Sequence, residues 1–198
     1  MKKFLTLAMA AIAAVCTLTS CDDDEKTAMR LSGEWEGEFY AYYEYYYKSE
    51  KTPRIEYASN TYMQFVPDHL FGSTKGTGYE VDFYNDGPIE YMFYEFEYKV
   101  TDGVLYLTYL DAEDMDVAIQ NYRLSYDRFK GYFGENRSSF ELYKLDSFDH
   151  TQYVSPYKAR AVDYINEYYG CGRTRAAEGD AEETELPIEI VSRGHHKR

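Results

Sequence analysis

A period-two alternation of apolar and charged side chains runs through most of the chain and constrains its fold more than any other feature. In residues 33–39, Trp35 and Phe39 share one face with Gly37, and three glutamates occupy the other face. Successive side chains of a β-strand point to opposite faces, so this segment is predicted to be a half-buried strand. Residues 92–100 repeat the alternation over a longer stretch. The pattern therefore predicts a chain built mainly from β-strands.

Short connections separate the segments that carry this alternation. They include the turn Asn85-Asp86-Gly87-Pro88 and the hairpin signal Asp102-Gly103. We predict a loop at residues 72–78 and strands at residues 33–47, 61–66, 79–83, 92–100, 104–110, 117–124, 129–133 and 140–145. Consecutive strands joined by short turns are typical of an antiparallel meander or barrel, so the predicted fold class is all-β.

The aromatic content of the chain agrees with this fold class. The sequence has 24 Tyr and 11 Phe, and 44% of its residues are hydrophobic. Tyr and Phe favour strands, so the composition supplies both the strands and their core. Beyond Tyr40 the first strand is aromatic on both faces. We therefore expect that strand to bend there, or to become buried on both sides.

One helix is expected after the last strand. Ser155 is a suitable N-cap and Pro156 suits the first helical position. Apolar side chains then recur every four residues, at Tyr157, Ala161, Ile165 and Tyr169. This stripe predicts an amphipathic helix on the outside of the sheet, ending at Gly170. Residues 171–198 are polar and charged apart from 186–191, and we predict a disordered tail.

The first twenty residues have the organisation of a secretory signal peptide. Lys2 and Lys3 precede an apolar run at residues 4–15, and small residues lead up to Cys21. The run is shorter than the roughly 20 residues that a membrane span needs. We therefore predict that residues 1–20 are removed, leaving 178 of the 198 residues.

The residues around the predicted cleavage point resemble a bacterial lipobox. Leu18-Thr19-Ser20-Cys21 matches precursors in which the cysteine is lipidated and the peptide is cut before it. This resemblance implies a lipid on Cys21, and each buried methylene of such a chain adds about 0.8 kcal/mol to membrane binding. The acidic run at residues 22–25 predicts an extended, solvated tether for residues 21–30.

The acidic run also resembles the export signal of Bacteroidota-type surface lipoproteins. The resemblance implies a protein anchored by lipid in the outer membrane and exposed at the cell surface. The alternative is the periplasmic face, because an Asp after the cysteine retains some lipoproteins of other Gram-negative bacteria in the inner membrane.

Charge and cysteine usage exclude several classes of protein. The formal net charge is −14 and becomes −16 once Lys2 and Lys3 leave with the signal peptide. A surface this acidic repels nucleic acid, so no nucleic-acid partner is expected. Cys16 also leaves and Cys21 carries lipid, which leaves Cys171 alone. No intramolecular disulfide is therefore expected.

Clusters of acidic residues and histidines are the candidate metal ligands. The loop at residues 111–116 offers carboxylates for calcium, but it lacks the glycine and closing glutamate of an EF-hand loop. We interpret it as an exposed acidic hairpin. Asp149, with Asp146 and His150, is more typical of a turn cap. His195 and His196 lie in the predicted tail, and no metal or cofactor site is predicted.

No catalytic constellation stands out. Residues 72–78 lack the order of a phosphate-binding loop. The acidic residues of the strands are expected on solvated faces, and Cys171 has no neighbouring base. The chain is therefore not expected to be an enzyme. Tyr40, Tyr42 and Tyr46 are expected on the surface, where they would either stack on sugar rings or shield neighbouring strands.

The strand region opens with the motif Leu31-x-Gly33-x-Trp35-x-Gly37 and ends with Leu124-Ser125-x-Asp127-x-Phe129-x-Gly131 and Phe140-x-Leu142-x-Lys144. These motifs resemble the lipocalin family and its bacterial lipocalin-like lipoprotein relatives. The resemblance covers residues 31–170, without the Thr-Asp-Tyr box of lipocalins proper. It implies an eight-stranded up-and-down barrel with Trp35 at the closed end. Such a barrel is either filled by side chains or holds one small ligand.

These observations lead to two functional hypotheses. The first is a lipid-anchored cell-envelope lipoprotein whose non-catalytic domain binds a small apolar ligand or a glycan. The alternative is an envelope sensor or inhibitor that acts through protein–protein contacts and has a filled barrel. Carboxylates that converge inside the barrel would point instead to an enzyme.

Overall fold

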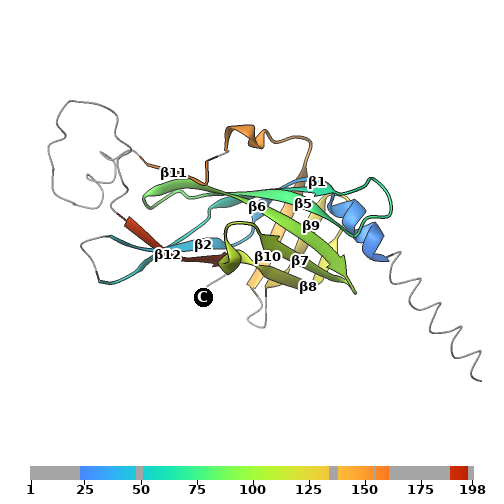
Figure 1. Cartoon of the computed structure of the whole chain (residues 1–198), viewed down its shortest axis with the longest axis horizontal. Coiled ribbons are helices and arrows are strands. Elements are labelled where there is room, and N and C mark those ends of the chain that lie inside the picture. The colour runs from blue at the N-terminus through green and yellow to red at the C-terminus, as the bar shows by residue number, and fades with distance from the viewer. Residues whose placement is uncertain (1–22, 48–50, 134–137, 154, 161–187, 196–198) are drawn as a thin grey trace, which may run out of the picture.

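The computed structural model describes residues 23–47, 51–133, 138–153, 155–160 and 188–195. The predicted signal peptide, Cys21 and residues 161–187 lie outside these ranges. Within them, strands dominate the structure (Figure 1). No helical segment in the described part of the chain has the length and apolar character needed to cross a membrane.

Eight strands close into an antiparallel up-and-down barrel. β6 pairs with β5 on one side and with β7 on the other, so the order β6-β5-β4-β1-β10-β9-β8-β7 returns to its start. This confirms the predicted fold class. The barrel strands are β1 (Gly33–Glu38), β4 (Asn60–Pro67), β5 (Lys75–Phe83), β6 (Ile89–Thr101), β7 (Val104–Tyr109), β8 (Val117–Leu124), β9 (Arg128–Phe133) and β10 (Ser138–Leu145).

A second sheet of three strands projects from the barrel and carries β2 (Ala41–Tyr47) between β3 (Arg54–Tyr57) and β12 (Ile188–His195). It begins at Tyr40, whose φ of 55° breaks the extended course of the first strand. The bend predicted near this residue is therefore confirmed. β1 pairs with β4 before the bend, and β2 pairs with β3 after it.

The C-terminal part of the chain differs from the prediction. Residues 157–159 form the strand β11 (Tyr157–Ala159) instead of the start of a helix. β6 is longer than β7, so its free edge offers backbone groups, and the N–H of Phe93 donates to the carbonyl of Pro156 over 2.9 Å. The predicted disordered tail is also wrong for residues 188–195, because these residues form β12 along the edge of β2.

The N-terminal tether is not extended. Residues 23–31 form a helix, called here the N-terminal helix, whose Ala28 and Leu31 are fully buried. Asp24 accepts hydrogen bonds from the N–H groups of Asp102 and Gly103, over 2.9 and 3.0 Å. The prediction of an extended tether considered only the mutual repulsion of the acidic side chains. Carboxylates are also favourable in the first turn of a helix, and these hydrogen bonds add to that effect.

The N-terminal helix covers the closed end of the barrel, where Trp35 is fully buried as predicted. The Trp35 indole N–H donates to the carbonyl of Leu31 over 2.7 Å. The ammonium of Lys144 lies 4.8 Å from the centre of the indole ring and donates to the carbonyls of Arg30 and Ser32. Burial lowers the pKa of Lys144. Apolar packing and matched polar groups thus close this end.

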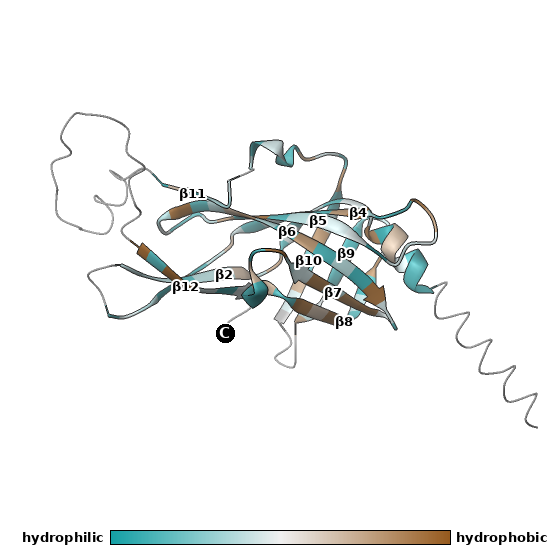
Figure 2. Ribbon diagram, in the orientation of Figure 1, coloured by the Kyte–Doolittle hydropathy of each residue, from teal (hydrophilic) through white to brown (hydrophobic). Residues whose placement is uncertain are grey.

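Aromatic and aliphatic side chains pack the interior between the strands. Along the barrel strands, hydrophobic and hydrophilic residues occur together on the same ribbon (Figure 2). The rings of Phe96 and Tyr98 lie against Gly78 and Gly76 of the neighbouring strand β5. A Cβ at Gly78 would come within 2.4 Å of Phe96, so only glycine fits beneath that ring. Aromatic and aliphatic side chains thus occupy much of the described interior.

Candidate functional site

The face of β5 that points into the barrel carries acidic residues. Glu80 and Asp82 are both 0% exposed and follow the interior glycines of the same strand. The sequence pattern predicted the opposite face inside, with Tyr79 and Phe83 buried and the carboxylates in solvent. Outside the barrel, Tyr79 stacks on His150 at 4.5 Å and Phe83 meets Tyr153 edge-on at 5.2 Å. The segment after β10 therefore covers the aromatic face of β5.

Glu80 lies at the centre of a buried hydrogen-bonded group. The phenol of Tyr109 in β7 donates to Glu80 Oε2 through a close contact. The His195 Nε2 atom of β12 lies 2.9 Å from Glu80 Oε1 and 3.4 Å from the Tyr109 hydroxyl. We call Glu80, Asp82, Tyr109 and His195 the mouth cluster. Three elements far apart in sequence build it.

Asp82 is the least satisfied member of the mouth cluster. The Thr61 hydroxyl donates to its Oδ1 atom over 2.6 Å, but its Oδ2 atom has no hydrogen-bond donor among the described residues. Burial raises the pKa of Asp82 well above its ordinary value, and the charge of Glu80 raises it further. Burial also raises the pKa of Tyr109, so its phenol stays protonated and can donate to Glu80. The mouth cluster therefore combines acceptors with weakly acidic groups in a dry environment.

Aromatic rings surround His195. Its side chain is 1% exposed, and its ring lies 4.8 Å from that of Phe39 and 5.6 Å from those of Phe133 and Tyr109. The contact with Phe133 is stacked and the contact with Phe39 is edge-on. His195 Nδ1 has no hydrogen-bond partner in the described ranges. The barrel mouth therefore holds one flat nitrogen-containing ring between aromatic walls and an acidic floor.

β12 carries His195 to this position along the edge of β2. The two strands are antiparallel, with Ile188 opposite Tyr47 and His195 opposite Ala41. Ser192 also donates to the carboxylate of Glu44 over 3.0 Å. β12 is not one of the eight barrel strands, and its pairing with β2 belongs to the projecting sheet.

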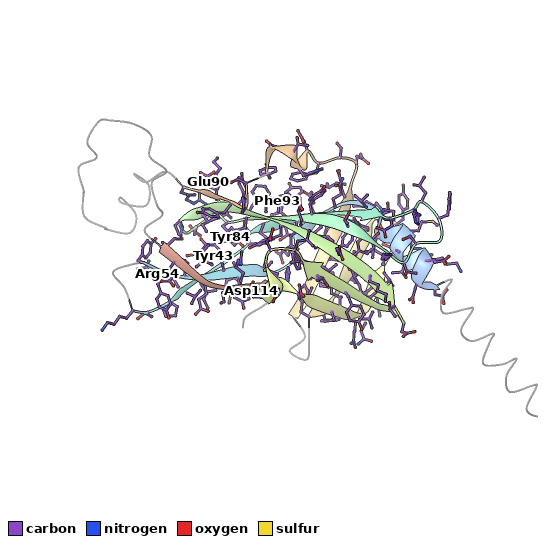
Figure 3. All side chains as sticks on the ribbon, viewed as in Figure 1. Tyr43, Arg54, Tyr84, Glu90, Phe93 and Asp114 are labelled. Carbon is purple, nitrogen blue, oxygen red and sulfur yellow. The ribbon has the colours of Figure 1, made fainter. Side chains whose placement is uncertain are left out.

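The acidic loop before β8 binds β12. Asp114 belongs to the short helix η1 (Glu113–Met115) and accepts from the backbone N–H of Arg193 over 2.7 Å (Figure 3). Its carboxylate also lies 3.6 Å from the Arg193 guanidinium. Asp116 accepts from the N–H of Tyr109 over 2.7 Å. Two of the candidate calcium ligands of residues 111–116 thus bind protein groups. Within the described residues, no group of three or more His, Cys, Asp or Glu side chains is placed to hold a metal ion.

A surface groove of about 280 Å³ runs beside the mouth cluster. Tyr94 contributes to its lining, and Ile190 and Arg193 of β12 form part of its wall. Tyr94 is 6% exposed, and its ring meets that of Tyr109 at 5.9 Å. The groove is therefore separated from the cluster by the tyrosine ring, and β12 contributes to its border.

Tyrosines fill the space between the projecting sheet and the long strands β5 and β6. Tyr43 of β2 meets Tyr84 edge-on at 4.7 Å between these two layers (Figure 3). Burial raises the pKa of Tyr84 well above its ordinary value. The inner face of β2 buries Tyr43, Tyr45 and Tyr47, so the aromatic interior continues beyond the barrel mouth.

The remaining candidate residues from the sequence have ordinary positions. Asp149 caps the short helix η2 (His150–Gln152) by accepting from the N–H of Thr151, which confirms the turn-cap interpretation. Tyr40, Tyr42 and Tyr46 are half-buried and do not stand free on the surface. Cys21, Cys171 and His196 lie outside the described residues.

Sequence reasoning missed the mouth cluster although two signals were present. Gly76 and Gly78 alternate in phase with Glu80, and small residues on one face mark the side that bulky rings cover. The apolar stretch 186–191 marked the tail as partly strand-like. Neither signal connects the tail to β2, because that pairing joins residues more than 140 positions apart.

The family model of a lipocalin-like domain matches residues 31–131, from the end of the N-terminal helix into β9. No curated protein and no solved structure matches the chain.

Proposed function

Because this chain belongs to the family of lipocalin-like domains, we propose that its barrel is a non-catalytic binding domain for a small, ring-containing molecule. The observation that carries the proposal is the position of the His195 ring, enclosed by aromatic walls at the barrel mouth. An eight-stranded barrel is just wide enough to hold one small ligand. An apolar ring or the apolar face of a sugar fits such walls, in keeping with the ligand classes expected from the sequence.

The converging carboxylates do not make an enzyme the better proposal. Acid–base catalysis requires a carboxyl group within hydrogen-bond reach of a reacting atom. Glu80 and Asp82 are 0% exposed, and the His195 ring contacts the carboxylate of Glu80. A substrate therefore does not reach either carboxylate while β12 is in place.

The proposal includes a membrane anchor. A lipid on Cys21, added after removal of residues 1–20, would hold the domain at the outer membrane, with the cell surface favoured over the periplasmic face. The lipobox-like residues 18–21 and the acidic residues after them support this part. Labelling with a radioactive fatty acid should mark the native chain and leave Cys21→Ser unmarked. Protease shaving of whole cells should remove the domain, whereas full protection would favour the periplasmic face.

Native mass spectrometry tests the binding function directly. The chain of residues 22–198 contains every described element and is incubated with a cell-envelope extract before measurement. A retained mass of a few hundred daltons, lost on denaturation, is the expected result. A chain that remains empty with extracts from several growth conditions contradicts the small-ligand function.

A second candidate function is contact with an envelope protein. The observation that favours it is the filled interior, in which aromatic side chains occupy the space that a ligand would need. In the same measurement this alternative predicts a retained protein mass and no small molecule. The two functions are therefore separated by the size of what is bound.

A further inference from the structure

β12 has an unusual relation to the barrel that it enters. Its backbone pairs with β2, and its side chains contact Glu44 and Asp114 near the surface. Ile188 and Ile190 also pack against the hydrophobic core. His195 points into the mouth cluster and is the member that β12 contributes.

The interior that receives His195 is costly to maintain. Two carboxyl groups lie on alternate residues of β5 at 0% exposure, and Asp82 Oδ2 has no donor among the described residues. Burying an unsatisfied polar group is unfavourable for folding. A mouth filled by apolar residues would avoid this cost. The carboxyl groups instead form an acidic floor suited to a ligand that brings hydrogen-bond donors.

The ion pair that joins β12 to the acidic loop is easily exchanged for contacts with water. The side chains of Arg193 and Asp114 are 32% and 40% exposed, and ion pairs of this kind contribute little. β12 lies at the edge of the projecting sheet, and β2 keeps β3 on its other side. The strand can therefore leave without opening any of the eight barrel strands.

We propose that β12 is an intramolecular occupant of the ligand site, and that its displacement opens the mouth cluster to a compact cation with a flat ring that donates hydrogen bonds. Glu80 and Asp82 would accept from the ligand, and Phe39 and Phe133 would pack against its ring, as they pack against His195. This inference rests on the proposed binding function and specifies its ligand class. The groove along Ile190 and Arg193 borders the strand that has to move.

Imidazolium is the probe for this site, and pyrazole is its matched control, because it has the same ring size but is uncharged near pH 6. Binding is measured by titration calorimetry with residues 22–198. Imidazolium should bind the unmodified chain weakly and should speed amide exchange at residues 188–195. Glu80→Gln should weaken imidazolium at least about tenfold, since a hydrogen bond to a charged group is lost. Pyrazole should bind less well than imidazolium and be insensitive to this substitution.

A reversible lock separates displacement from simple cavity filling. Glu44 and Ser192 are opposite each other in β2 and β12, so Glu44→Cys with Ser192→Cys, in a Cys171→Ser chain, allows a cross-strand disulfide. The oxidised chain should lose imidazolium binding and the reduced chain should regain it. Arg193→Ala, which removes the pair with Asp114, should act in the opposite direction and strengthen binding, whereas the exposed Glu189→Gln should leave it unchanged.

The outcomes distinguish this inference from the binding function itself. Equal imidazolium binding to the oxidised and reduced chains, or none to the unmodified and Arg193→Ala chains, overturns the inference. If an extract-derived ligand binds the locked chain as well as the open chain, the binding function stands and the role of β12 falls. If no extract-derived ligand and no imidazolium binds any chain, both fall.

Discussion

The two ends of the barrel are closed by segments from opposite ends of the chain, and they are closed in different ways. The N-terminal helix packs Leu31 over Trp35, and the Trp35 indole N–H and the Lys144 ammonium both have hydrogen-bond partners there. At the mouth, β12 brings His195 onto two buried carboxyl groups, and Asp82 is left partly unsatisfied. One end is centred on an apolar side chain, and the other on buried carboxyl groups.

This difference links the closed end to the stability of the fold and the mouth to the proposed binding function. Apolar burial with matched hydrogen bonds stabilises a fold, whereas buried charge usually costs stability unless every group is paired. A structure that buries two carboxyl groups at the mouth, and covers them with a strand outside the barrel, keeps that end available for another role. The following substitutions test this division between the two ends.

The largest loss of stability is expected at the closed end. Trp35→Ala removes a fully buried indole with its hydrogen bond to Leu31 and its contact with Lys144, and should lower the free energy of unfolding by about 3–5 kcal/mol. Urea denaturation followed by circular dichroism measures this, because the substitution removes the single tryptophan. Trp35→Phe should cost less. A loss below about 1 kcal/mol would show that the closed end does not stabilise the fold.

A gain of stability is expected at the mouth. Because burial and Glu80 raise the pKa of Asp82, the unfolded chain releases this proton near pH 3.8 while the folded chain retains it. The free energy of unfolding therefore falls as the pH rises from about 4 toward the raised pKa of the folded chain. Asp82→Asn should remove this fall and add about 1–3 kcal/mol near pH 7, because the amide is neutral at every pH and folding no longer requires the uptake of a proton.

Denaturation curves of both chains between about pH 4 and 8 provide the measurement. The control is Asp68→Asn, at an acidic residue in the loop outside the barrel. Parallel pH dependence in the unmodified and Asp82→Asn chains would remove the argument that the mouth carries a stability cost.

A smaller loss is expected where the N-terminal helix binds the Asp102-Gly103 turn. Asp24→Asn keeps one acceptor oxygen but loses the other and the charge, so the free energy of unfolding should fall by about 1 kcal/mol. Asp23→Asn is the matched control, because the Asp23 side chain is 80% exposed one residue earlier. Equal effects of the two substitutions in thermal denaturation would mean that general charge, and not the two hydrogen bonds, matters.

The smallest effect is expected on the barrel wall between the ends. Glu141 contacts Arg128 at the surface, and this contact lowers the pKa of Glu141. Glu141→Gln should nevertheless leave the urea midpoint unchanged, because exposed ion pairs are screened and entropically costly. A clear shift of the midpoint would mean that the wall, and not only the ends, depends on charge.

The barrel could be predicted from the sequence because its signals are local. Alternation along β6, the Asp102-Gly103 turn and the bend near Tyr40 each involve a few consecutive residues. The position of Trp35 at the closed end was implied by the resemblance of its motif to lipocalins. In these regions, neighbouring residues determine the structure.

The mouth could not be predicted, because its construction depends on distant contacts. Alternation in β5 identifies two faces but not which one is inside, and here Tyr79 is covered by His150 from a segment 70 residues later. The tail looked disordered because its strand needs the edge of β2 to satisfy its backbone groups. The helix expected from Tyr157 does not form, because residues 157–159 satisfy their backbone groups by pairing with the free edge of β6.

The N-terminal helix also has a consequence for orientation. Its described part starts at residue 23, two residues after Cys21, and two residues span at most about 7 Å. If Cys21 carries lipid as proposed, the barrel lies directly against the bilayer with its closed end inward, instead of swinging on a long arm. Leu70 and Phe71, 81% and 80% exposed in the loop beside this helix, then lie on the membrane side. In that orientation the mouth with His195 would point away from the bilayer, and a ligand would arrive from the aqueous side.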